Sequence, residues 1–271
     1  MVGRVDLIFV KLGGSVITDK STPYKEKRDV IARLAREIHH AHEQTGMRLL
    51  VGHGGGSYPH TPANRYKTHL GLVDEESRLG IALVQDAAAR LNRIVVQHLI
   101  EEGEKAVSVQ PSCAALSRNG RIVSWDLRAI RLMMNLDLTP VPYGDVSMDL
   151  AKGCSILSTE ELLHYLGIKL KPERVLVGSD VDGIYDKDPK KSSVARKIPL
   201  VTVENMNSVL PSLGGANTVD VTGGMRSKVL SLLELTKVTG VECEVLDISK
   251  VGNLEDALNG KRGIGTIIRR V

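Results

Sequence analysis

Short apolar runs alternate with stretches of helical periodicity along almost the whole chain, and no other feature limits its fold as strongly. The runs predicted as strands cover residues 5–10, 48–53, 105–110, 173–179, 242–248 and 265–270. Apolar residues recur at helical spacing over 28–43, 74–103, 127–136, 158–167 and 222–240. Strands separated by helices of crossover length predict an α/β fold with a mostly parallel sheet covered on both faces. We expect a boundary between two lobes near residues 169–172.

Two shorter signals mark local features between these elements. Asn119-Gly120 lies inside the stretch SRNGRIVSW and is typical of the turn of a β-hairpin. Ser158, followed three residues later by Glu161, is a capping signal that predicts the start of a helix. The segment TPVPYGDV, residues 139–146, lies between them and is expected to be extended.

The composition is that of a globular protein with an aliphatic core. Hydrophobic residues make up 42% of the 271 residues, whereas aromatic residues make up 3%. The formal net charge is +4 and both signs alternate along the chain, which argues against a nucleic-acid-binding surface. Three separate cysteines form no CxxC pair, so we expect neither disulfides nor a zinc site. Because no signal peptide or membrane span is visible, we expect a cytoplasmic protein that binds neither nucleic acid nor membrane.

Glycine-bearing turns follow three of the predicted strands, and a fourth opens a predicted helix. They are Gly13-Gly14-Ser15, Gly54-Gly55-Gly56-Ser57, Gly178-Ser179-Asp180 and Gly223-Gly224. Ligands of parallel sheets bind beyond the carboxyl ends of the strands, where backbone N–H groups of such turns hold anions. Neither a GxGxxG fingerprint nor a GxxxxGK[ST] P-loop is present, which disfavours a dinucleotide enzyme and a P-loop NTPase. The turns therefore predict an anion-binding crevice.

Three lysines lie close to these turns in the sequence. Lys11 ends a buried-type strand, Lys20 follows the first glycine pair, and Lys228 lies one helical turn after Gly224. A surface lysine would be unusual at the end of a buried strand, so Lys11 is the strongest candidate for a functional role. Phosphoryl transfer needs positive charge around the transferred group and little covalent chemistry. Three lysines in one crevice would meet that need.

Six motifs in order along nearly the whole chain resemble those of the amino-acid kinase superfamily. They are VKLGGSVITDK, GHGGGSYPH, TPVPYGDV, SDVDGIYDKDPK, DVTGGMRSKV and GTIIR. The histidine that ends GGGSYPH, His60, makes the chain similar to the isopentenyl phosphate kinase branch, because related N-acetylglutamate and uridylate kinases lack it there. The resemblance implies an open αβα sandwich, a homodimer, and an enzyme that phosphorylates isopentenyl phosphate with ATP and Mg²⁺. It also implies an acceptor lobe that includes the dimer contact, residues 1–169, and a nucleotide lobe, residues 170–271.

The resemblance assigns roles to individual residues of this sequence. The implied catalytic residues are Lys11, Lys20, His60 and Lys228. The implied acceptor ligands are Gly54, Gly55, Gly56, His60, Thr159 and Glu160. The implied nucleotide ligands are Lys11, Gly13, Gly14, Ser15, Gly55, Ser179, Asp180, Asp182, Tyr185, Lys187, Gly224 and Lys228. No protein metal site is implied, since Mg²⁺ would arrive with the phosphates of the nucleotide.

A histidine suits an acceptor that is itself a phosphate. A phosphate monoester has a second pKa of about 6, so it is already an anionic nucleophile near neutral pH. It needs orientation and partial neutralisation rather than a strong general base. With an unperturbed pKa of about 6.5, a histidine such as His60 can supply both.

Two positions differ from the family pattern. Pro59 precedes His60 where the family usually has glycine, and it stiffens the approach to that histidine. The family's Ser-Gly-Asp is replaced by Ser158-Thr159-Glu160. We expect Thr159 to fill space that glycine leaves for a phosphate, and Glu160 to organise the lysines with one methylene more.

The apolar tail of the acceptor is expected near the long helix. The candidates for its pocket are Leu79, Ile81, Leu83, Val84, Ile130, Met133 and Met134. Three histidines, His39, His40 and His42, resemble a metal cluster, but their helical spacing puts them on a polar face, where we expect them to face solvent.

Two other functions fit parts of this pattern. A kinase of the superfamily could act on another small acceptor, such as a different monophosphate, a phosphonate or a carboxylate, if residues 79–84 lined a polar pocket. A nucleotide-binding regulator without turnover would fit the changes at Thr159 and Glu160. Such a regulator would not need to retain all of Lys11, Lys20, His60 and Lys228.

Overall fold

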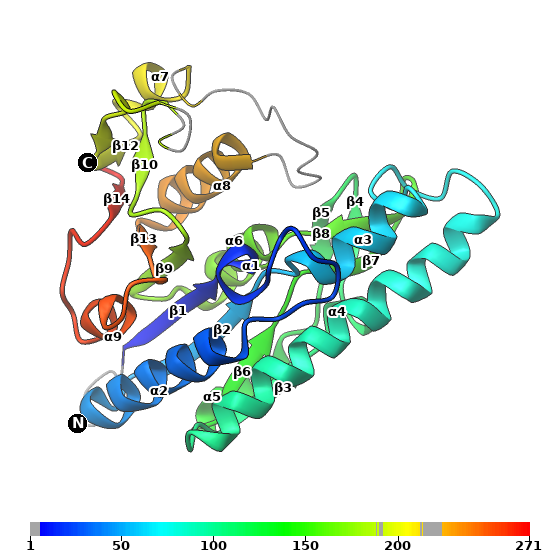
Figure 1. Cartoon of the computed structure of the whole chain (residues 1–271), viewed down its shortest axis with the longest axis horizontal. Helices are drawn as coiled ribbons and strands as arrows, with labels where there is room; N and C mark the ends of the chain where they lie inside the picture. Colours follow the sequence, from blue (N-terminus) through cyan, green and yellow to red (C-terminus); the bar gives the residue numbers. More distant parts are fainter. Residues whose placement is uncertain (1–5, 188, 190–191, 212, 214–223) are drawn as a thin grey trace.

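A six-stranded sheet forms the centre of the computed structural model (Figure 1), which describes residues 6–187, 189, 192–211, 213 and 224–271. The strand order is β12-β14-β13-β9-β1-β2. The strands are β1 (Leu7–Leu12), β2 (Arg48–His53), β9 (Arg174–Ser179), β12 (Leu200–Thr202), β13 (Glu242–Asp247) and β14 (Thr266–Arg269). Neighbouring strands are parallel except for β13 and β14. The predicted mostly parallel sheet is therefore confirmed.

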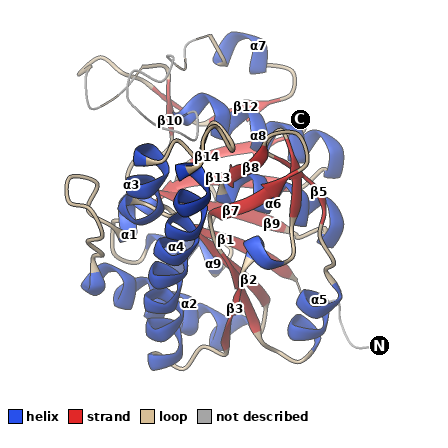
Figure 2. Ribbon diagram, turned by 90° about the vertical axis from the view of Figure 1, so that its right-hand side faces the viewer, coloured by secondary structure: helices blue, strands red, loops and turns tan. Residues whose placement is uncertain are grey.

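Helices cover both faces of this sheet (Figure 2), because successive residues of its strands point to opposite sides. In β1, Ile8 and Val10 belong to one buried cluster, and Phe9 belongs to another. The first cluster is completed by α2 (Arg28–Thr45), α4 (Glu76–Glu101) and α9 (Asn253–Leu258). The second is completed by α5 (Arg128–Asn135), α6 (Thr159–Leu170) and α8 (Gly224–Thr239). The expected αβα sandwich is thus confirmed.

The remaining elements extend the sheet or connect its strands. The strands β3 (Ala106–Val109) and β6 (Thr139–Pro142) pair in parallel, and a bridge between His53 and Tyr143 joins them to β2. A separate four-stranded sheet contains β4 (Leu116–Arg118), β5 (Arg121–Ser124), β7 (Asp145–Asp149) and β8 (Gly153–Leu157). The short elements are α1 (Gly14–Ile17), α3 (Ser57–Arg65), the 3₁₀ helix Pro111–Cys113, β10 (Ile184–Tyr185), β11 (Lys197–Ile198) and α7 (Met206–Val209).

Both local signals of the sequence mark real features. Asn119 and Gly120 adopt φ angles of 52° and 78° and join the antiparallel strands β4 and β5, so the predicted hairpin is confirmed. The hydroxyl of Ser158 accepts a hydrogen bond from the backbone N–H of Glu161 and starts α6 as predicted. The carboxylate of Glu161 does not return to the cap, because it accepts the N–H of Ile122 in the hairpin at 2.9 Å.

The predicted lobe boundary falls between strands of one continuous sheet. Strands β1 and β2 come from residues 1–169, whereas β9, β12, β13 and β14 come from the later part of the chain. The two parts therefore share backbone hydrogen bonds between β1 and β9.

The expectation that all three helix histidines face solvent is wrong for His42. Its Nδ1 atom lies 3.0 Å from both carboxylate oxygens of Glu104, which is 3% exposed and also accepts a hydrogen bond from Thr139. The hydrogen bond that His42 donates to Glu104 raises the pKa of His42, against the effect of burial. Burial opposes ionisation of Glu104, but the bonds from His42 and Thr139 outweigh it and lower its pKa. The pair fastens α2 to β3 and β6.

We predict that Glu104→Gln destabilises the protein by about 1 to 3 kcal/mol near pH 5.5, the cost of an impaired buried hydrogen bond to a charged partner. The contribution of Glu104 is present above its ordinary pKa of 4.5 and is lost as the pH falls through its lowered value. The contribution of His42 is present below 6.5 and is lost as the pH rises through its raised value. Urea unfolding of the variant and of Glu43→Gln, an exposed control on α2, measures the difference. An undiminished gap at pH 9 would contradict the role of charged His42.

Candidate active site

A cavity of about 1130 Å³ lies at the carboxyl ends of β1, β2 and β9. Sixteen of the residues predicted for the site line it: Lys11, Gly13, Gly14, Ser15, Lys20, Gly54, Gly55, Gly56, His60, Thr159, Glu160, Ser179, Asp180, Tyr185, Lys187 and Lys228. Asp182 is not among its lining residues and instead accepts a hydrogen bond of 2.6 Å from the hydroxyl of Tyr185. Gly224 is the first residue of α8, and Gly223 lies outside the described residues. The structure thus brings nearly all of the predicted residues together.

The glycine turns of this site pack directly against one another. A β-carbon on Gly14 would lie 2.5 Å from the backbone nitrogen of Gly56, and one on Gly54 would lie 2.9 Å from that of Gly14. A β-carbon on Gly13 would lie 2.6 Å from the carbonyl oxygen of Gly178. Side chains are therefore excluded first of all by neighbouring backbone, which the sequence could not reveal. The same packing leaves backbone groups of three strand ends facing one crevice.

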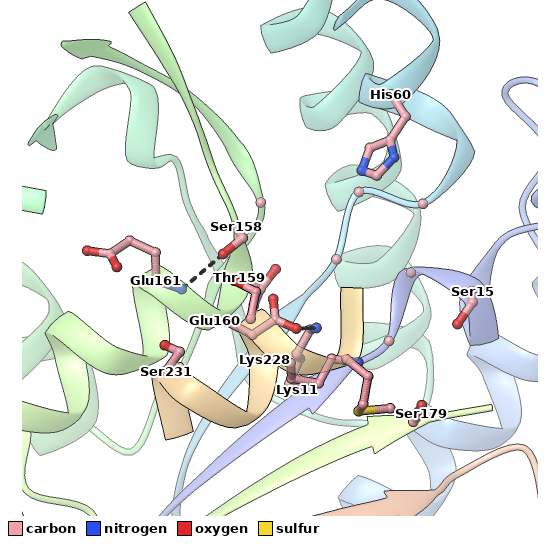
Figure 3. A pocket seen from close by; sticks show the side chains of 18 of the residues that line it. Lys11, Ser15, His60, Ser158, Thr159, Glu160, Glu161, Ser179, Lys228 and Ser231 are labelled. Atoms are coloured by element: carbon pink, nitrogen blue, oxygen red, sulfur yellow. Dashed lines mark hydrogen bonds and ion pairs between the residues drawn. The ribbon is translucent and has the colours of Figure 1, made fainter. Parts of the chain in front are cut away.

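A carboxylate lies between two lysines at the floor of the cavity (Figure 3). Lys11, in β1, is 6% exposed and forms an ion pair with Glu160 of α6. Burial opposes the ionisation of Glu160, but the charges of Lys11 and then Lys228 outweigh it and lower its pKa to about 2. Glu160 therefore stays ionised, paired with Lys11 and close enough to Lys228 for that charge to act on it.

Thr159 is 2% exposed and fits into space left by two glycines. Its hydroxyl donates a hydrogen bond of 2.7 Å to the carbonyl oxygen of His53. A β-carbon on Gly52 would lie 3.0 Å from its methyl group, and one on Gly144 would lie 3.3 Å from its hydroxyl. Because most of the side chain is enclosed in this way, Thr159 takes up less of the cavity than we expected from the sequence.

The histidine of GHGGGS, His53, is a neutral anchor of the glycine turn. Its Nδ1 atom lies 3.1 Å from the carbonyl oxygen of Gly54 and must donate, so its Nε2 atom accepts from the amide of Asn92 at 3.1 Å. Burial lowers the pKa of His53 to about 4. The ring also stacks on Tyr143 at a centroid distance of 5.6 Å.

His60 lies on helix α3, which is not among the helices predicted from the sequence. In Figure 3 it stands apart from the Lys11–Glu160 pair and Lys228. From the sequence, Ser57 was named only as the end of a glycine turn and was given no role of its own. It is the first residue of this helix and lines the same cavity, and its buried hydroxyl has no hydrogen-bond partner in the described structure. A serine at a helix start after three glycines is the signal that could have indicated it.

The tip of the β4–β5 hairpin also reaches the cavity, which the sequence did not indicate. Arg121 forms ion pairs with Glu161 of α6 at 3.1 Å and with Glu234 of α8 at 3.0 Å. All three residues line the cavity. The hairpin is thereby joined to the helix that carries Lys228.

The predicted tail-binding residues do not line this cavity. Leu79 is 56% exposed, while Ile130 and Met134 belong to the cluster under α5, α6 and α8. The apolar cavity wall near α3 is instead formed by Pro59 and Ile156. Ile156 packs against a small buried cluster that includes Val84, with Ile81 beside it, so these two candidates lie one layer behind the wall.

Comparison with known proteins agrees with this geometry. The model of the amino acid kinase family matches residues 6–247. Isopentenyl phosphate kinase of Methanothermobacter thermautotrophicus is 39% identical over 97% of this chain and 98% of its own length, and that of Methanocaldococcus jannaschii is 32% identical over 94% and 96%. An X-ray structure of isopentenyl phosphate kinase superposes with a TM-score of 0.80 at 34% identity, over 97% of this chain and 99% of its own. Carbamate kinase from Giardia lamblia, at 16% identity, shares the fold with a TM-score of 0.70 and covers 99% of both chains.

The chain therefore belongs to the amino acid kinase family, whose model covers most of its length. Within that family it belongs with the isopentenyl phosphate kinases, to which it is similar from end to end.

We predict that Glu160→Gln lowers the thermal stability of the unliganded protein and enlarges the stabilisation by ATP. Removing one partner of a buried ion pair costs about 3 to 5 kcal/mol, because Lys11 and Lys228 would then repel each other without compensation. Nucleotide phosphates would supply the missing negative charge. Melting curves with and without Mg-ATP test this, with Glu234→Gln as a control that also lines the cavity. Since Glu160 titrates near pH 2, the difference should be equal at pH 5.5 and 7.5. An ATP-induced shift equal to that of wild type would refute the prediction.

Proposed function

We propose that the chain transfers the γ-phosphoryl group of ATP to the phosphate of isopentenyl phosphate and forms isopentenyl diphosphate. The observation that carries this proposal is the convergence of Lys11, Lys20, His60 and Lys228 on one cavity with three glycine turns. The similarity to isopentenyl phosphate kinases over nearly the whole chain supports the choice of acceptor. The product would serve isoprenoid synthesis.

The reaction is an in-line displacement. An anionic oxygen of the acceptor phosphate forms a bond to the γ-phosphorus while the bond from that phosphorus to the β,γ-bridging oxygen breaks, and ADP leaves. Lys11 and Lys228, held by Glu160, would neutralise the phosphates of the nucleotide, together with N–H groups of the Gly13–Ser15 turn. Lys20 would stabilise the charge on the transferred group. His60 would donate a hydrogen bond to the acceptor phosphate and orient it.

We further propose that Mg²⁺ enters with ATP. In the described part of the chain, no three His, Cys, Asp or Glu side chains are grouped so that they could hold a metal ion. This fits an ion bound mainly by nucleotide phosphates and water, as is usual for Mg²⁺ at nucleotide sites. When bound, the ion would supply further positive charge to the phosphates of the nucleotide.

Our proposal for the arrangement of the ligands follows the two walls of the cavity. The acceptor would lie beside α3 with its apolar tail against Pro59 and Ile156, and the nucleotide would lie along Ser179, Asp180 and Tyr185. Residues 1–169 would thus bind the acceptor and form a homodimer, and residues 170–271 would bind the nucleotide.

No helix in the described structure is long and apolar enough to cross a membrane. We propose that the enzyme acts in the cytoplasm.

A coupled assay of ADP release with Mg-ATP tests the function. Isopentenyl phosphate is compared with N-acetylglutamate, uridylate and fosfomycin, and dimethylallyl phosphate is added as a close analogue. We expect turnover on isopentenyl phosphate and none on the first three. ATP binding without turnover on any of them would favour a regulator, and turnover on another acceptor alone would replace the proposed substrate.

We predict that His60→Ala lowers turnover of isopentenyl phosphate by about ten- to hundredfold, the range for losing one hydrogen bond to a charged group. Steady-state kinetics with both substrates varied measures the loss. His69→Ala on the segment after α3 is a matched control, because that histidine does not line the cavity. Unchanged kinetics in His60→Ala would remove the residue from the mechanism.

Lys20→Ala is predicted to lower kcat while leaving the affinity for ATP nearly unchanged, because an exposed loop lysine contributes mainly when charge develops on the transferred group. Titration with a non-hydrolysable ATP analogue separates the two quantities. A parallel loss of nucleotide affinity would instead make Lys20 a ground-state ligand of the phosphates.

A further inference from the structure

The segment that carries Lys20 is a closed loop that rests on helix α3. Thr18 and Glu26 form an antiparallel bridge, and the N–H of Asp19 donates to the carbonyl oxygen of Lys25 at 2.9 Å. Within the loop, the carboxylate of Asp19 accepts hydrogen bonds from the N–H and hydroxyl of Ser21. The loop, residues 18–27, is therefore ordered at its neck and at Lys20.

One side chain of α3 joins this loop to the helix that carries His60. Tyr58 is 5% exposed, and its hydroxyl donates a hydrogen bond of 2.5 Å to the carboxylate of Glu26. Its ring meets the edge of Tyr24 at a centroid distance of 5.7 Å. Successive side chains on a helix are separated by about 100°, so Tyr58 and His60 project in different directions. Tyr58 can thus hold the loop without entering the acceptor site.

The hydrogen bond from Tyr58 to Glu26 ends on a charged carboxylate, which makes it stronger than a bond between neutral groups. The hydrogen bond from Tyr58 is the main reason that the pKa of Glu26 is lowered, so the acceptor is a carboxylate. The other carboxylate oxygen of Glu26 accepts from Arg28 at 2.8 Å. The guanidinium of Arg90 from α4 lies 5.6 Å from the centre of the Tyr24 ring. The loop is held between α3 and α4 by these contacts.

We propose that Tyr58 is a positioning residue that fixes the 18–27 loop on α3 and thereby sets Lys20 relative to His60. The inference rests on the proposed function for the roles of Lys20 and His60, but the contact itself does not. The side chain of Lys20 is exposed and lines the cavity, so its position depends on the backbone of the loop. The hydroxyl of Tyr58 joins the helix that carries His60 to the loop that carries Lys20 through one partly buried hydrogen bond.

The test compares Tyr58→Phe with Tyr66→Phe. Tyr66 follows the same helix, and its hydroxyl has no protein partner in the described part of the chain, so both variants lose one hydroxyl. We expect Tyr58→Phe to lower kcat about tenfold, less than the roughly hundredfold that a displacement of 1 Å can cause. The KM for ATP should stay unchanged, and Tyr66→Phe should match wild type.

A double-mutant cycle separates positioning from general stability. If Tyr58 acts through Lys20, Tyr58→Phe has no further effect on kcat in a Lys20→Ala background. An equal loss of kcat in both backgrounds would overturn the proposal, as would wild-type kinetics in Tyr58→Phe.

A second readout needs no acceptor. Hydrogen exchange at the N–H groups of Asp19 and Ser21, and trypsin cleavage after Lys20 and Lys25, should be faster in Tyr58→Phe than in Tyr66→Phe. Equal rates would overturn the proposal. If wild type failed to use isopentenyl phosphate while the loop still loosened in Tyr58→Phe, the proposed function would be wrong and the loop contact would stand.

Discussion

Contact between the backbones of two glycine turns determines where the rest of the site lies. Gly14 and Gly56 approach so closely that no side chain fits between them, which fixes the start of α1 against the start of α3. The hydroxyl of Thr18 completes this contact by donating to Gly14 and accepting from the N–H of Ser57. The Lys20 loop follows α1, and His60 lies on α3. The two groups that we assign to the reacting phosphates therefore lie on segments that begin at this contact, and the hydrogen bond from Tyr58 to Glu26 joins these segments a second time.

The charged side chains at the floor of the cavity provide the neutralising charge that the glycine turns lack. Backbone dipoles attract phosphate but do not neutralise it, so lysines are needed, and two lysines close together repel each other. Glu160 between Lys11 and Lys228 leaves a net charge of +1, from two positive charges and one negative. The group can thus exist in the unliganded protein and still attract an anion. Because Glu160 titrates far below neutral pH, this balance does not change over the range in which a phosphate acceptor gains its second charge.

Most strands and long helices were predictable from the sequence because their signals are local. Helix α3 was not predictable, because its sequence contains Pro59 and Pro62. Pro59 lies in the first turn, where it costs no hydrogen bond, but Pro62 lies inside the helix, where a proline argues against helix. The start of α3 at Ser57 is held by Thr18, which is far away in the sequence. The burial of His42 depends on Glu104, 62 residues away, and helical periodicity contains no trace of it. The prediction of the tail pocket was wrong for a similar reason. Helical periodicity identifies an apolar face of α4, but it does not say which part of that face lines a cavity. Convergence of the lysines was predictable only through the family resemblance, because spacing in the sequence does not place strand ends side by side.

The change from glycine to threonine before Glu160 is absorbed on the side away from the open cavity. Gly52 and Gly144 make room for Thr159, whose hydroxyl bonds the carbonyl group of His53. His53 in turn holds Gly54 and Asn92 as a neutral ring with a pKa of about 4. A chain of neutral hydrogen bonds therefore runs beneath the glycine turn from α6 to α4, and its geometry is insensitive to pH and salt. Thr159 thus contributes a hydrogen bond to the support of the glycine turn, and most of its side chain lies outside the open cavity.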